Sequence, residues 1–201
     1  LGLKSVLLFE QVDEKLKDNY GSEAINKDGL MQRAIKSIKD KYPSLLVMSD
    51  VALDPYSSNG HDGVVENGLI VNDITNDVLS KMSLTHIEAG ADFVAPSDMM
   101  DGRVKVIRTL FEKEGYHNAG IMSYSAKYAS CFYGPFRDAL DSKPGFGDKK
   151  TYQMDIGNRN EAMNEVKLDI QEGADIVMIK PGISYLDIIR DIKNNFNIPI
   201  S

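Results

Sequence analysis

Short apolar segments alternate with longer segments of helical periodicity along the 201-residue chain, and this alternation restricts the fold more than any other feature. It is typical of an α/β fold, in which each helix returns the chain to the next parallel strand. We expect helix N-caps at Asp28 and Asn158, whose side-chain oxygens can accept the free amide hydrogens of a first turn. Strands are predicted at residues 5–9, 45–53, 91–95, 119–124 and 174–180, and helices at residues 28–41, 73–89, 102–114, 158–172 and 184–196.

A helix end, a Gly-Ala-Asp turn and an apolar strand occur in the same order at residues 86–94 and 169–177. We interpret this as a repeated βα unit, and units of this kind build a TIM (β/α)8 barrel. A doubly wound open sheet is the alternative, although no G-x-G-x-x-G motif opens a helix here. Because a complete barrel needs about 250 residues, the chain is predicted to form a single partial barrel domain.

The composition argues against several classes of function. The chain has 23 Lys and Arg against 30 Asp and Glu, a net charge of −7, which disfavours a nucleic-acid partner because phosphates need a basic surface. No apolar run approaches the about 18 residues that span a bilayer, so we expect no membrane partner. Cys131 is the single cysteine and cannot form an intrachain disulfide. The chain opens at Leu1, and no targeting segment can be read there.

Two loops interrupt the alternation and are predicted to act as lids. Residues 54–73 contain Asn67-Gly68 between short apolar runs, which predicts a β-hairpin. Residues 142–157 are polar, include Pro144, and are too long for a plain turn. Both loops follow strands, so both belong on the face where barrels keep their active sites.

Lys127 and Lys180 are the first candidates for catalysis. Lys180 ends an apolar strand, where burying a charged amine is unfavourable unless its pKa shifts or it gains a partner. Lys127 lies just past the end of the preceding predicted strand, so the two amines converge if these strands are neighbours, and each cation then lowers the pKa of the other. A neutral lysine amine forms Schiff bases with carbonyl compounds. The alternative is that each lysine is solvated or belongs to an ion pair.

Other polar side chains follow the remaining strands. Asp50, Asp54 and Asp62, with His61, could bind a hard cation or transfer protons, although Asp before Pro or Gly is also ordinary turn chemistry. Ser97 follows a further strand. Donors suited to a substrate carboxylate are found between residues 137 and 153, namely Arg137, Lys149, Lys150 and Gln153.

Four long segments, residues 95–104, 122–138, 146–155 and 178–189, closely resemble the 5-aminolevulinate dehydratase family, also called the porphobilinogen synthases. The resemblance runs along essentially the whole chain. It implies a lyase that condenses two 5-aminolevulinate molecules through lysine Schiff bases, with loss of water, to porphobilinogen, an early step of tetrapyrrole biosynthesis. A Schiff-base aldolase acting on another keto substrate is the alternative enzyme.

The resemblance also implies roles for individual residues. Lys180 matches the family lysine that holds the substrate supplying the propionate side of the product, and Lys127 matches the lysine of the acetate-side substrate. Asp50 is implied to handle protons. The implied substrate-binding residues are Ser97, Tyr133, Arg137, Lys149 and Gln153, and many members have arginine at the position of Lys149.

Expectations about metals follow from the same resemblance. Zinc-dependent members carry three cysteines where this chain has Ala52, Asp54 and Asp62, so cysteine-bound zinc is excluded and the chain resembles the aspartate-rich type of plastids and many bacteria. Glu165 matches a carboxylate associated with an allosteric Mg²⁺. The loop of Asp54 and Asp62 offers a metal only oxygen ligands, or forms a hydrogen-bonded lid without metal. No organic cofactor is implied.

The family fold is an eight-stranded barrel with an N-terminal arm, usually assembled as a homo-octamer. By resemblance the chain covers about strands 2 to 6 and the start of strand 7, so the arm, strand 1, most of strand 7 and strand 8 are expected to be absent. The chain alone is then either the catalytic middle of the enzyme or an inactive fragment. The complete enzyme is expected in the cytoplasm or a plastid.

Overall fold

Five parallel strands form one sheet whose spatial order follows the sequence. The computed structural model describes residues 2–133, 145 and 147–201, with only the backbone of residue 133. Each strand joins the same growing edge, as in a barrel, whereas a doubly wound sheet grows at both edges. The strands are, in order, β1 (Ser5–Leu8), β2 (Leu46–Val51), β5 (Phe93–Pro96), β6 (Gly120–Lys127) and β7 (Ile176–Lys180).

The last residues of the chain continue this sheet. The Val177 amide donates to the Pro199 carbonyl at 3.1 Å, and the Ser201 amide donates back to the Val177 carbonyl at 2.9 Å. The pairing at Val177 and Ile200 is parallel. A sixth strand therefore begins beside β7, as the sequence predicts.

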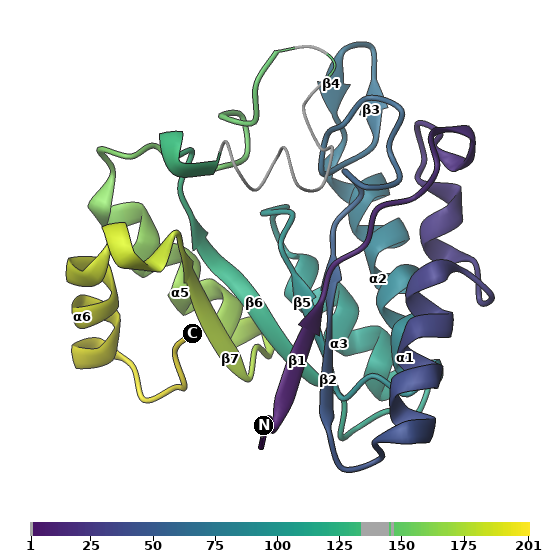
Figure 1. Ribbon diagram of the computed structural model, residues 1–201. Coiled ribbons are helices and arrows are strands. Elements are labelled where there is room, and N and C mark those ends of the chain that lie inside the picture. The colour runs from purple at the N-terminus through teal and green to yellow at the C-terminus, as the bar shows by residue number, and fades with distance from the viewer. Residues whose placement is uncertain (1, 134–144, 146) are drawn as a thin grey trace.

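The helices cover the outer face of the sheet (Figure 1). Apolar side chains such as Val47 and Ile179 pack against them, whereas Met122, Tyr124 and Met178 form a smaller cluster on the concave face. This one-sided helix layer confirms the partial barrel. In the described part of the chain no helix is long and apolar enough to cross a membrane. The helices are α1 (Leu30–Lys41), α2 (Asn72–Glu88), α3 (Arg103–Lys113), α5 (Arg159–Glu172) and α6 (Leu186–Asn195).

The two Gly-Ala-Asp turns have the same structural role, which confirms the predicted repeat. Asp92, before β5, accepts a β2 amide at 2.8 Å and Lys39 Nζ at 2.9 Å. Asp175, before β7, accepts a β6 amide at 2.8 Å and Arg108 Nη2 at 2.6 Å. Asp92 thus links the start of β5 to β2 and to α1, the helix that precedes β2. Asp175 links the start of β7 to β6 and to α3, the helix that precedes β6.

The predicted hairpin and one predicted helix cap are confirmed. Asn67 and Gly68, with φ of 51° and 76°, form the turn between β3 (Val65–Glu66) and β4 (Leu69–Ile70). The Asn158 side chain caps α5 by accepting a first-turn amide hydrogen at 3.2 Å. The short 3₁₀ helices are η1 (Glu14–Leu16), η2 (Ser22–Ile25), η3 (Cys131–Tyr133) and η4 (Gly182–Ser184).

Asp28 is not a helix cap, and that prediction was wrong. Helix α1 begins at Leu30 after Gly29, which has no side chain that could cap it. The Asp28 amide donates to Asn26 Oδ1 at 3.0 Å. This local hydrogen bond places Asp28 in the turn before the helix.

Candidate active site

The carboxyl ends of β6 and β7 bring Lys127 and Lys180 together. The two residues are partners in the parallel register, and neighbouring strands lie about 4.8 Å apart. Lys127 is the last residue of β6, not a residue beyond it, because the strand continues to 127 instead of ending at 124. The centroid of the Tyr124 ring lies 5.9 Å from Lys127 Nζ and 4.9 Å from Lys180 Nζ. The predicted convergence of the two amines is confirmed.

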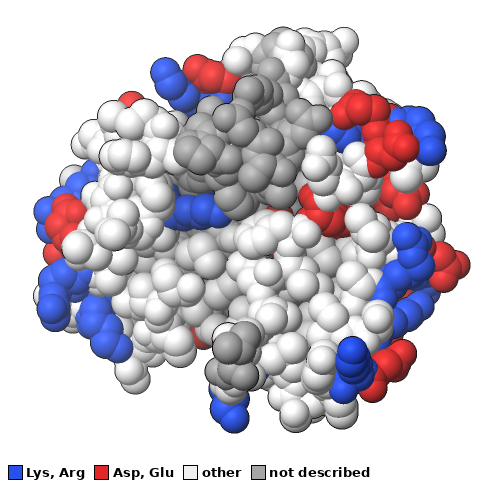
Figure 2. Space-filling model, in the orientation of Figure 1, with Lys and Arg blue, Asp and Glu red and all other residues white. Residues whose placement is uncertain are grey.

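Lys180 lies against aromatic rings on the concave face. Besides Tyr124, the ring of Phe9 lies near its amine, with 5.7 Å from Nζ to the centroid. Burial, and after it the positive charge of Lys127, lowers the pKa of Lys180 to about 8. Figure 2 shows this face: uncharged atoms cover most of it, and a basic group lies in the central hollow. Near neutral pH an appreciable fraction of the Lys180 amine is therefore neutral and nucleophilic.

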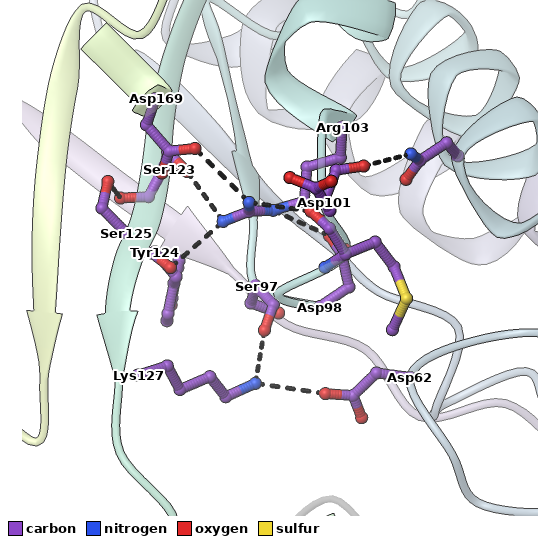
Figure 3. Close-up of polar contacts among 12 residues, drawn as sticks. Asp62, Ser97, Asp98, Asp101, Arg103, Ser123, Tyr124, Ser125, Lys127 and Asp169 are labelled. Atoms are coloured by element: carbon purple, nitrogen blue, oxygen red, sulfur yellow. Dashed lines mark hydrogen bonds and ion pairs between the residues drawn. The ribbon is translucent and has the colours of Figure 1, made fainter. Parts of the chain in front are cut away.

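Lys127 is surrounded by oxygen atoms instead (Figure 3). Its Nζ donates to the main-chain carbonyl of Ser97 at 2.5 Å and lies 3.3 Å from Asp62 Oδ2. Burial alone would lower the pKa of Lys127, but the nearby carboxylates, Asp62 foremost, raise it. The expectation of mutual lowering is thus right for Lys180 and wrong for Lys127, where several carboxylates outweigh the effect of burial.

Asp50 lies near the end of β2 and is 8% exposed. Its Oδ1 has no hydrogen-bond partner among the described residues. Burial and the negative charge of Asp54 raise the pKa of Asp50 to about 7, against opposing effects of Lys127 and of a hydrogen bond from Ser97. A carboxyl group that titrates near neutral pH can accept and return a proton. This environment agrees with the proton-handling role predicted for Asp50.

Asp54 and Asp62 are ion-paired with a lysine. Lys149 Nζ lies 3.0 Å from Asp54 Oδ2 and 2.5 Å from Asp62 Oδ1. Burial would raise the pKa of Asp62, but the ammonium groups of Lys149 and Lys127 lower it. The same carboxylates raise the pKa of Lys149 against the effect of its burial. The site therefore contains a buried network of alternating charges.

A second contact fastens the segment after residue 147 to the loop of Asp62. The hydroxyl of Tyr152 accepts the Asp62 amide hydrogen at 3.3 Å and lies 3.2 Å from His61 Nδ1. The two rings meet edge to face, with centroids 6.1 Å apart. Parts of both predicted lid segments are thus in direct contact beside the lysines.

The other predicted substrate-binding residues have different positions. Ser97 contacts Lys127 through its carbonyl, as described. Gln153 is buried, its Oε1 has no hydrogen-bond partner within the described chain, and it lines a cavity together with Lys149 and Tyr185. Arg137 and the side chain of Tyr133 lie outside the described residues. Contact of any of these groups with substrate stays a prediction.

The predicted metal-binding residues differ in how well they fit a metal ion. Among the described residues, no group of three His, Cys, Asp or Glu side chains is arranged to hold one. Asp54 and Asp62 do not fit, because the ammonium of Lys149 lies between them. Glu165 on α5 is half-buried, and burial followed by the negative charge of Asp169 raises its pKa. Such a carboxylate suits a hard cation that keeps several water ligands, as Mg²⁺ does.

Sequence reasoning missed three residues at or near this site, and the burial of a fourth, Arg103. Tyr124 and Phe9 flank Lys180. Glu10, just after β1, is buried with a pKa raised to about 8, chiefly by burial. Arg103, the first residue of α3, is 2% exposed. No local sequence pattern indicates that a glutamate and an arginine in such positions are buried.

The chain spans about half the length of the curated relatives it matches. Delta-aminolevulinic acid dehydratase, chloroplastic, from Pisum sativum is 55% identical over 202 residues, which cover 100% of this chain and 51% of the relative. Delta-aminolevulinic acid dehydratase 1, chloroplastic, from Arabidopsis thaliana is 56% identical, and the match covers 100% of this chain and 47% of the relative.

Solved structures give the same result for the fold. The crystal structure of delta-aminolevulinic acid dehydratase (porphobilinogen synthase) from Toxoplasma gondii, in complex with the reaction product porphobilinogen, superposes with a TM-score of 0.97 at 52% identity, covering 99% of this chain and 57% of that one. A 2,3-dimethylmalate lyase, 10% identical with a TM-score of 0.55, shares the fold alone. The family model of delta-aminolevulinic acid dehydratase matches residues 1–201. With its whole length matched, this chain belongs to the delta-aminolevulinic acid dehydratase family.

Proposed function

We propose that the chain is the catalytic part of a porphobilinogen synthase, which condenses two 5-aminolevulinate molecules through Schiff bases on Lys180 and Lys127. The observation that carries this proposal is the register pairing of the two lysines, with both amines near one Tyr124 ring. Two adjacent amines suit a reaction that joins two molecules of one keto substrate. The family name and the porphobilinogen bound to the Toxoplasma relative support the choice of substrate.

In this proposal Lys180 reacts first. Its pKa of about 8 leaves part of the amine neutral at physiological pH. The neutral nitrogen attacks the ketone carbon, the carbonyl oxygen leaves as water with both amine hydrogens, and a proton taken up from the medium leaves the imine protonated. This cation stays beside the rings of Tyr124 and Phe9, whose faces attract positive charge.

Lys127 must lose a proton before it can react. The raised pKa of Lys127 keeps its ammonium charged while Asp62 and the Ser97 carbonyl hold it. Asp50 is suited to accept this proton, because its pKa of about 7 is close to neutral pH. Its Oδ1 also has no hydrogen-bond partner among the described atoms. Arrival of the second substrate would also draw Lys149 toward the substrate carboxylate, which loosens the network around Asp62.

Magnesium, assembly and compartment complete the proposal. Glu165 would hold an allosteric Mg²⁺ through its carboxylate, with water as the remaining ligands, and the bound ion would supply positive charge outside the reaction centre. Glu165→Gln is expected to remove any response of activity to Mg²⁺ without changing Schiff-base formation. We expect the complete protein to form a homo-octamer. The chloroplastic relatives support a plastid location.

Borohydride trapping tests the proposed chemistry. The protein is incubated with 5-aminolevulinate, hydride reduces any protonated imine to a stable secondary amine, and peptide mass mapping locates the adducts. We expect adducts on Lys180 and Lys127. Lys180→Met should lower porphobilinogen formation by about a thousandfold or more, the order of loss when a nucleophile is removed. Lys113→Met is the matched control, because Lys113 is exposed at the end of α3.

The outcomes separate the proposal from its alternative. Adducts on neither lysine would contradict the proposal. Equal trapping of unrelated keto acids would favour a Schiff-base aldolase with another substrate.

A further inference from the structure

Strand β6 contains one residue more than the stretch of β7 with which it pairs. Ser123 pairs with Val177, and Ala126 pairs with Ile179, so three steps along β6 match two steps along β7. One extra residue in a paired strand is a β-bulge, which turns the side chains beyond it. The bulge lies immediately before Lys127.

The bulge changes the face to which Lys127 points. Tyr124 packs in the cluster on the concave face, so strict alternation would send Ala126 to that face and Lys127 toward the helices. Ala126 packs instead in the cluster on the helix side. The alternation is therefore shifted by one residue, and Lys127 reaches the concave face beside Lys180 because of the bulge.

Arg103 binds the backbone and a side chain of the bulge (Figure 3). Its Nη2 donates to the Tyr124 carbonyl at 3.1 Å and to Ser123 Oγ at 3.0 Å. Its Nη1 donates to the Met100 carbonyl at 3.0 Å and lies 3.4 Å from Asp169 Oδ1. Ser123 Oγ donates to the other oxygen of Asp169 at 2.7 Å. The guanidinium thus joins β6 to α5 and to the loop after β5.

This arrangement meets a specific need of the bulge. A bulge disrupts the ladder of backbone hydrogen bonds, and a buried carbonyl without a partner is unfavourable. The planar guanidinium of Arg103 supplies several donors in fixed directions, which an ammonium group cannot do. Its Nε also lies 3.6 Å from Asp98 Oδ2. Asp98 follows Ser97 in the sequence, and the Ser97 carbonyl accepts a hydrogen bond from the Lys127 amine. Arg103 therefore contacts the strand that carries Lys127 and the loop that holds its amine.

We infer that Arg103 is a positioning residue for Lys127: by fixing the bulge in β6 it turns the Lys127 amine into the site. The orientation of Lys180 does not depend on the bulge, because Lys180 belongs to the neighbouring strand β7. The inference rests on the proposed Schiff-base function of the two lysines. It predicts that loss of the planar Arg103 guanidinium lowers imine formation at Lys127 and leaves imine formation at Lys180 largely unchanged.

Arg103→Lys tests the inference, because it keeps a positive charge opposite Asp169 but loses the planar fork. In borohydride trapping with 5-aminolevulinate, the ratio of the Lys127 adduct to the Lys180 adduct should fall by about tenfold, as expected for a misplaced reactive group. The matched control is Arg108→Lys. Arg108 lies on the same helix and donates to the Ala119 carbonyl at 2.8 Å, before the other end of β6. This control should leave the ratio unchanged.

Two further variants keep the inference testable if Arg103→Lys folds poorly. Ser123→Ala removes one hydroxyl from the bulge and should lower the same ratio by a smaller factor. Asp169→Asn removes the negative charge that Arg103 and Ser123 both contact and should also lower the ratio. Equal loss of both adducts in these variants, or an unchanged ratio, would overturn the inference. Absence of both adducts in the unaltered protein would instead overturn the proposed function.

Discussion

Lys127 and Lys180 occupy paired positions on neighbouring strands, yet their surroundings shift their pKa values in opposite directions. Lys180 faces the rings of Tyr124 and Phe9, and its pKa is lowered to about 8 by burial and by Lys127. Lys127 faces Asp62 and the Ser97 carbonyl, and its pKa is raised. Burial acts on both amines in the same direction, so the difference comes from the carboxylates.

This difference assigns the two lysines to separate steps. An amine that is partly neutral at rest can attack a carbonyl directly, whereas a charged one needs a base and a change in its ion pairs. Two identical substrates can therefore be bound in a fixed order by two identical side chains. Neighbouring groups, not residue type, determine this order.

Substitution of Asp62 should remove the difference between the pKa values of Lys127 and Lys180, and it has the largest expected effect on trapping. Asp62→Asn removes the carboxylate that most strongly raises the pKa of Lys127, so the pH profile for trapping at Lys127 should move to lower pH, toward that of Lys180. Removing one partner of a buried ion pair also destabilises the fold, here by about 4 kcal/mol. Trapping measured from pH 6 to pH 9, with urea unfolding of the same samples, tests both effects.

The control for this substitution is Asp148→Asn. Asp148 is exposed and its Oδ2 lies 3.7 Å from the exposed Lys150 Nζ, so neither measurement should change. An unaltered Lys127 profile in Asp62→Asn would show that Asp62 does not determine the charge of Lys127.

Two buried carboxyl groups, those of Asp62 and Glu10, also have pKa values shifted in opposite directions. Asp62 is buried between lysines and its pKa is lowered, whereas Glu10 has no recorded ion pair in the described chain and its pKa is raised to about 8. Between its ordinary pKa of 4.5 and 8, the folded state keeps a proton that the unfolded state releases, so the free energy of unfolding falls as pH rises through this range. Glu10→Gln should remove this loss and stabilise the fold at pH 8.5 by up to about 5 kcal/mol.

Thermal or urea unfolding at pH 4.5 and pH 8.5 measures this effect. The variant and the unaltered protein should be equally stable at pH 4.5 and should differ at pH 8.5. Glu114→Gln is the control, because Glu114 is exposed on the surface. A variant that is no more stable than the unaltered protein at pH 8.5 would show that Glu10 is ionised in the fold.

The sequence predicted the strands of the sheet because they depend on local periodicity. Apolar runs and turn glycines mark the strands, and two lysines at successive strand ends then lie at one edge of the sheet. The end of β6 was placed at 124 instead of 127 because apolar character alone does not reveal a bulge. The bulge is stabilised by Arg103 from another element, so it is a property of the assembled fold.

The charge states of the site were harder to predict for the same reason. Lys149 was expected to bind a substrate carboxylate, and the structure pairs it with Asp54 and Asp62, which lie far from it in the sequence. Motif spacing identifies residue types that gather at one edge, but it does not determine which charges pair. That pairing decides the sign of each pKa shift.

Phe9 offers the smallest and most selective test of the contrast between the two lysines. Its ring lies 5.7 Å from Lys180 Nζ, and a cation near an aromatic face gains about 0.5 to 1 kcal/mol. Phe9→Leu keeps an apolar side chain but removes the ring, so the ammonium form of Lys180 loses that stabilisation and its pKa should fall by about half a unit. The pH profile for trapping at Lys180 should then move to lower pH while that of Lys127 stays in place. A shift of equal size at both lysines would mean that Phe9 acts on the shape of the whole site and not on the Lys180 charge, whereas a shift confined to Lys180 would establish the ring as part of its environment.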